Sequence, residues 1–82
     1  MNQMIYEQFK RSGFQLNFKR VEAGLYETGC GRFVIRKRWK YWEVLDKEKH
    51  FPRVAEGVTL KQAKENASLY AWYYLKHIWR AR

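Results

Sequence analysis

The sequence predicts a single α+β domain spanning residues 1–82, with helices covering one face of an antiparallel sheet. The composition is typical of a folded chain, since 46% of the residues are hydrophobic and 18% are aromatic. Apolar residues alternate along the middle of the chain, as in strands, and recur every three or four positions near both ends, as in helices. The predicted order is therefore one helix, three or four antiparallel strands and a second helix (α-β-β-β-α in its simplest form).

The first helix is predicted from Asn2 to Ser12. Met1, Ile5 and Phe9 recur four residues apart, which places them on one side of a helix. Gly13 follows as a natural helix stop, because glycine readily takes the left-handed conformation. A helix this short is marginal alone, so we expect it to dock on the rest of the domain.

A first strand is predicted from Leu16 to Val21, where apolar and polar residues alternate. Glu22-Ala23-Gly24 interrupts it. Leu25–Thr28 is then either a continuation past a bulge or a separate strand. Gly29-Cys30-Gly31 predicts a turn, because two glycines there can supply positive φ.

A β-hairpin is predicted from Arg32 to Asp46, with a tight turn near Trp39 and Lys40. Its apolar residues would form one face of the sheet: Phe33, Ile35, Trp42 and Val44. Side chains that alternate with these would point into solvent from the other face: Arg32, Arg36, Arg38 and Tyr41. The stretch Lys47–Gly57 is expected to be a loop that holds one short edge strand near Arg53–Ala55.

The last helix is predicted from Leu60 to about Arg80. Thr59 and Gln62 fit a capping box at its start. A stripe of residues at helical spacing should cover the sheet: Leu60, Ala63, Ala67, Tyr70, Ala71, Tyr74 and Ile78. Three aromatic residues lie partly outside this stripe: Trp72, Tyr73 and Trp79. They either pack on the first helix or form a surface for self-association or for a protein partner.

Charge is the main functional signal. The 17 Lys and Arg residues against 8 Asp and Glu leave a net charge of +9, which favours anionic partners: nucleic acid first, then an acidic protein surface or anionic lipid. Five cations are concentrated in the predicted hairpin: Arg32, Arg36, Lys37, Arg38 and Lys40. They would track a phosphate backbone, with Trp39 or Tyr41 stacking on a base or packing on sugar. The alternative is an ordinary solvated strand face whose charges protect the sheet edge.

Catalysis and metal binding are not expected. Cys30 lies in the predicted glycine turn, and His50 and His77 are the only candidate bases, with no sign of an orienting acid or an oxyanion pocket. These three residues lack the close pairing of zinc ligands, so we expect no cofactor. No stretch resembles a signal peptide or a membrane span, which predicts a cytoplasmic protein without membrane contact.

The order and length of these elements resemble a double-stranded-RNA-binding domain. The family's second helix opens with a small hydroxyl residue, two lysines, any residue, alanine and lysine. Thr59-Leu60-Lys61-Gln62-Ala63-Lys64 is similar to it, with Leu60 in place of the first lysine. The resemblance implies that Lys61 and Lys64 contact phosphates at the start of this helix.

The stretch Gly31–Asp46 followed by Thr59–Ala67 is also similar to small sheet-plus-helix modules of phages and mobile elements, including the amino-terminal arm-site domains of some integrases. That resemblance implies that the sheet faces the major groove of DNA. We therefore expect a non-enzymatic, basic protein that binds duplex DNA or duplex RNA. The alternative is a phage-type inhibitor that binds an acidic or nucleic-acid-binding surface of a host defence protein.

Overall fold

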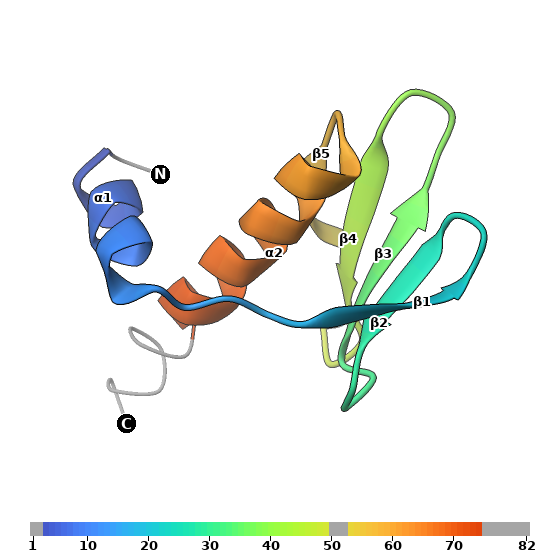
Figure 1. Cartoon of the computed structure of the whole chain (residues 1–82), viewed down its shortest axis with the longest axis horizontal. Coiled ribbons are helices and arrows are strands. Elements are labelled where there is room, and N and C mark those ends of the chain that lie inside the picture. Colours follow the sequence, from blue (N-terminus) through green and yellow to red (C-terminus); the bar gives the residue numbers. More distant parts are fainter. Residues whose placement is uncertain (1–2, 50–52, 75–82) are drawn as a thin grey trace.

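The computed structural model describes residues 3–49 and 53–74, which form two helices and five strands. In chain order the elements are α1 (Gln3–Ser12), β1 (Phe18–Glu22), β2 (Leu25–Thr28), β3 (Phe33–Lys37), β4 (Trp42–Asp46), β5 (Arg53–Gly57) and α2 (Leu60–Tyr73). The strands form one antiparallel sheet in the order β1-β2-β3-β4-β5. Helix α2 packs on one face of this sheet, chiefly over β5 and β4, and α1 packs on α2 (Figure 1).

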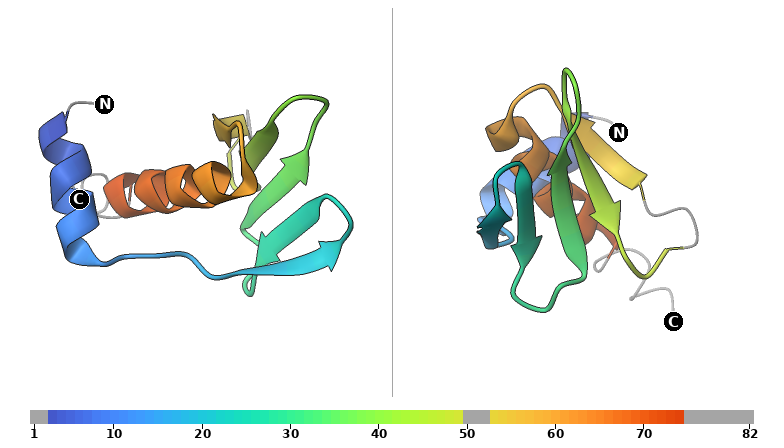
Figure 2. Two further views of the ribbon diagram at one scale, coloured as in Figure 1. Left: turned by 45° about the horizontal axis from the view of Figure 1, so that its top comes forward. Right: turned by 90° about the vertical axis from the view of Figure 1, so that its right-hand side faces the viewer.

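The α+β class and the antiparallel sheet are confirmed, and the sheet has more strands than the simplest predicted order. Leu25–Thr28 is a separate strand, because Gly24 has φ +77° and closes a tight turn between β1 and β2. The segment expected to be mostly loop contributes a full edge strand, Arg53–Gly57. Of the two described helices, only α2 covers the sheet, since α1 lies at the end of α2 that is farther from the sheet (Figure 2).

The core lies between α2 and the sheet. Ile35 and Val44 face each other across β3 and β4, and both are 0% exposed. Ala63 and Ala67 of α2 are equally buried, and their small side chains let the helix lie close to the strands. The alternation in the hairpin and the helical stripe therefore predicted the two sides of the core correctly.

The start of α2 is fixed tightly against the end of β5. Thr59 Oγ1 accepts a hydrogen bond from the backbone N–H of Gln62 at 3.1 Å, and Gln62 Oε1 accepts one from Val58 N–H at 3.0 Å. The predicted cap is confirmed, with Val58 rather than Thr59 as the second donor. A side chain at Gly57 would lie closer than 3.0 Å to backbone atoms of Gln62 and Ala63, so only glycine fits there.

Helix α1 docks on α2 through aromatic and polar contacts. The ring centroids of Phe9 and Trp72 lie 5.8 Å apart, and Trp72 is only 9% exposed. Tyr6 Oη donates a hydrogen bond to Glu65 Oε1, and Lys10 Nζ lies 3.4 Å from the same oxygen. For Trp72 the structure therefore has the first of the two predicted arrangements, packing on the first helix.

Candidate nucleic-acid interface

Three connections meet at one end of the sheet, because neighbouring antiparallel strands alternate in direction. They are the β1–β2 turn, the β3–β4 turn and the β5–α2 connection (Figures 1 and 2). The backbone N–H of Lys37 donates to Gly24 O at 2.8 Å, and Trp42 pairs with Gly57, so all three connections are linked. We call this region the basic end, defined by Lys37, Arg38, Trp39, Lys40 and Tyr41 of the hairpin and by Lys61 and Lys64 of α2.

The tip of the β3–β4 hairpin presents an aromatic ring and a cation together. Arg38 N–H donates to Tyr41 O at 2.8 Å, which closes the turn at the predicted position. Trp39 is 87% exposed, and Lys40 Nζ lies 4.5 Å from its ring centroid. An exposed indole beside an ammonium group is suited to stacking on a base whose phosphate the lysine contacts.

Two further lysines flank an aromatic pair on the side of the sheet that faces α2. The rings of Tyr26 and Trp42 meet edge to face with centroids 6.0 Å apart. Lys37 Nζ lies 5.0 Å from the centroid of Trp42, and Lys64 Nζ lies 5.1 Å from that of Tyr26. The sequence did not single out Tyr26, because its place beside Trp42 depends on the pairing of β2 with β3 and β4.

The open face of the sheet, which points away from α2, carries mixed charge. Arg36 binds Glu43 Oε1 through two guanidinium nitrogens, one of them at 2.7 Å, and Arg38 Nε lies 3.9 Å from the same oxygen. Arg53 similarly forms an ion pair with Glu56. The side chains of Arg36 and Arg38 are about half exposed, as predicted, but Glu43 offsets one of their two charges.

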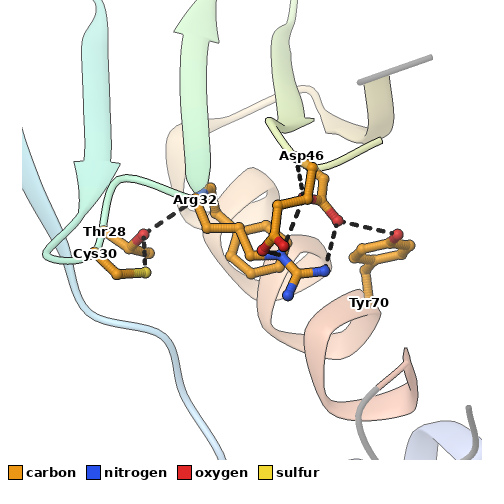
Figure 3. Close-up of polar contacts among 7 residues, drawn as sticks. Thr28, Cys30, Arg32, Asp46 and Tyr70 are labelled. Carbon is orange, nitrogen blue, oxygen red and sulfur yellow. Dashed lines mark hydrogen bonds and ion pairs between the residues drawn. The ribbon is translucent and has the colours of Figure 1, made fainter. Parts of the chain in front are cut away.

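Arg32 was expected to point into solvent from the open face, and this expectation is wrong. Its guanidinium binds both carboxylate oxygens of Asp46, with Nε 3.1 Å from Oδ1 and Nη2 3.2 Å from Oδ2 (Figure 3). It also forms an ion pair with Glu48 at 2.9 Å. Because Asp46 is 0% exposed on the α2 side of the sheet, it draws Arg32 towards the core, where the Arg32 side chain is 23% exposed.

Asp46 is held as a buried carboxylate. It also accepts hydrogen bonds from the backbone N–H of Glu48 at 3.0 Å and from Tyr70 Oη at 3.3 Å (Figure 3). Burial raises the pKa of Asp46, but these hydrogen bonds and the charge of Arg32 outweigh burial and leave that pKa below its usual value. Burial, followed by the charge of Asp46, raises the pKa of Tyr70 to about 12. This cluster connects the chain around β3 and β4 to α2.

Four lysines of the basic end keep their charges available. Within residues 3–49 and 53–74, no carboxylate forms an ion pair with Lys37, Lys40, Lys61 or Lys64. Tyr41 is half-buried, with the guanidinium of Arg53 4.9 Å from its ring centroid. The structure thus brings the predicted hairpin cations and the predicted helix lysines to the same end of the sheet.

The remaining candidate residues lie elsewhere. Cys30 is exposed, and hydrogen bonds with Thr28 and with the backbone of Arg32 lower the pKa of its thiol. Tyr73 is half-buried, whereas Trp79 and both histidines fall outside the described residues. Over the same described ranges there is no cluster of three metal-ligating side chains, and neither helix has the length and apolar character needed to cross a membrane.

This chain was compared with known protein families, proteins and structures. No family model, curated protein or solved structure matches this chain.

Proposed function

We propose that this protein binds nucleic acid by placing the phosphate backbone against its basic end. The observation that carries the proposal is the position of Lys37, Lys40, Lys61 and Lys64. They come from two distant parts of the sequence to one end of the sheet, and no carboxylate of the described residues forms an ion pair with them. With a net charge of +9, the whole domain attracts a polyanion towards this end. Arg38 adds a fifth, partly neutralised cation.

The chemistry of these groups suits a phosphate chain. Each lysine that neutralises a phosphate releases condensed counterions, which is the main source of affinity in contacts that do not depend on base sequence. Lys61 lies in the first turn of α2, where the helix dipole adds to the positive potential. The exposed Trp39 at the hairpin tip provides a surface for a base or a sugar.

An acidic surface of another protein is the second candidate partner. It is favoured by two exposed apolar side chains at the basic end, Trp39 and Val58, the latter 71% exposed. Apolar anchors surrounded by cations suit a protein interface as well as a nucleic acid. Trp72, which the sequence offered as a partner anchor, is buried against Phe9 and does not add to this candidate.

Paired substitutions test the nucleic-acid proposal and separate the contribution of the hairpin lysines from that of the α2 lysines. We expect Lys37→Glu with Lys40→Glu, and independently Lys61→Ala with Lys64→Ala, to weaken binding to duplex DNA or duplex RNA at low salt by at least about tenfold. Lys19→Glu is the control matched in charge to the Lys61 and Lys64 pair, and Lys19 is an exposed lysine on the open face of β1. Binding would be measured by fluorescence anisotropy, with circular dichroism to check the fold.

Each result has a defined meaning. Loss of binding in both paired variants, with Lys19→Glu close to wild type, supports the basic end as the phosphate-binding surface. Loss in one pair only would restrict the surface to the hairpin or to the helix. If Lys19→Glu weakens binding as much as the Lys61→Ala and Lys64→Ala pair, which changes the net charge by the same amount, only the net charge matters and the proposed surface would be wrong.

A further inference from the structure

A groove lies between the end of α1, the segment that follows it and the first half of α2. Its volume is about 520 Å³, within the range of small-molecule sites. It is lined by Phe9, Lys10, Gly13, Phe14, Gln15, Leu60, Lys61, Lys64, Glu65 and Ser68. The groove exists because Gly13, with φ +71°, turns the chain away at the end of α1 while Phe9 keeps the helix on α2.

The groove combines apolar walls with a positive rim. Phe9, Phe14 and Leu60 supply apolar surface, two of them as aromatic rings. Three lysines line the same groove: Lys10, Lys61 and Lys64. The one acid there, Glu65, already accepts the hydroxyl of Tyr6 and pairs with Lys10, and these contacts lower its pKa, so the rim keeps a net positive charge.

We propose that this groove receives one unpaired nucleobase while Lys61 and Lys64 hold the adjacent phosphates. The inference rests on the proposed function and narrows it to nucleic acid with an unstacked base, such as a single strand or a bulge. A base offers a flat apolar face to the half-buried Phe14, with the buried Phe9 as part of the groove wall, and its phosphates match the lysine rim in charge.

Continuity with the basic end selects this occupant. Lys61 and Lys64 belong to both surfaces, and Lys64 also lies over Tyr26. Because the two surfaces share these lysines, a phosphate chain bound along the basic end reaches the rim of the groove. An isolated fatty acid or a short acidic peptide would use the groove but leave Lys37 and Lys40 without a role.

The test varies the ligand and the protein together. Wild-type protein is titrated with an oligothymidylate about a dozen nucleotides long, a length within known single-strand site sizes, and with a deoxyribose-phosphate chain of the same length that lacks bases. Both ligands carry the same number of phosphates. We expect the base-bearing chain to bind about tenfold more tightly, in line with the loss of one base–aromatic stack.

Phe14→Ala should remove this preference and leave the affinity for the base-free chain unchanged. Phe14→Leu, which removes the aromatic ring but keeps the apolar bulk, should do the same and serves if Phe14→Ala proves unstable. Met4→Ala is the control, because Met4 is 69% exposed on α1 and does not line the groove. Its preference for the base-bearing chain should match that of the wild type.

Four outcomes would overturn the inference. If wild type binds both chains equally but also binds duplex nucleic acid, the groove holds no base and the proposed function stands. If the preference survives both groove variants, the base stacks elsewhere, with Trp39 the next residue to test. If a medium-chain fatty acid binds in a Phe14-dependent way while the two chains bind alike, the groove is a site for amphiphiles. Absence of binding to every nucleic acid would remove the proposed function itself.

Discussion

Replacing Asp46 by asparagine should destabilise the fold strongly, because this buried carboxylate holds four hydrogen bonds. Two come from Arg32, one from the backbone of Glu48 and one from Tyr70. Removing one partner of a buried ion pair costs about 3–5 kcal/mol. We expect the lower limit, about 3 kcal/mol, because Arg32 is partly exposed and keeps Glu48 as an ion-pair partner.

That loss is large for a chain of this length. A domain of 82 residues has a total stability of about 4–12 kcal/mol, so Asp46→Asn removes a quarter or more of it. The melting temperature, measured by circular dichroism, should fall by roughly 12–24 °C. Glu56→Gln is the matched control, because Glu56 pairs with Arg53 in solvent, and it should leave the melting temperature nearly unchanged.

The pH dependence of Asp46→Asn gives a second check. The pKa of Asp46 is lowered in the folded state, so its stabilising effect is complete above the unfolded pKa of about 3.9 and is lost as pH falls through the folded value. The stability difference between wild type and the variant should therefore narrow below about pH 4. A difference under about 1 kcal/mol at neutral pH, or one that stays constant into acid, would refute this account of the cluster.

Three other substitutions test the packing. Gly57→Ala should lower the free energy of unfolding by about 1–3 kcal/mol in denaturant titrations, because the new methyl group meets the backbone of α2. Gly29→Ala is the control and should be nearly neutral, because a methyl group there meets nothing within 4 Å. Tyr70→Phe should lower the free energy of unfolding by about 1 kcal/mol at pH 8. Since the folded pKa of Tyr70 is raised to about 12, that loss should shrink as pH rises above about 10, which melting curves of wild type and variant at each pH would show. Trp72→Ala should cost about 3–5 kcal/mol while the solution mass stays that of the wild type; a stable variant with altered mass would instead indicate an interface.

Local patterns predicted much of the fold. Alternation in the hairpin placed Ile35 and Val44 on the buried face, and the capping residues located the start of α2. The extra strand Arg53–Gly57 was underestimated, because its short mixed sequence gains its order from pairing with β4 and from packing under α2. Such long-range contacts leave little trace in local composition.

The candidate site was only partly predictable for the same reason. Charge and the helix-start motif identified the lysines of the basic end, but no local signal showed that Arg32 is bound to Asp46 or that Arg36 is bound to Glu43. Those pairings depend on cross-strand contacts between β3 and β4 and the residues that flank them. The groove beside α1 likewise depends on how two helices dock, which the helical spacing alone does not determine.

The most direct test of the central claim is the salt dependence of nucleic-acid binding by the wild-type protein. If Lys37, Lys40, Lys61 and Lys64 each neutralise one phosphate, a plot of log affinity against log salt concentration should have a slope of about −2.8 to −3.6. The Lys61→Ala and Lys64→Ala pair should reduce the steepness of that slope by about 1.4–1.8. A slope near zero, or one that the paired substitution leaves unchanged, would contradict phosphate binding at the basic end.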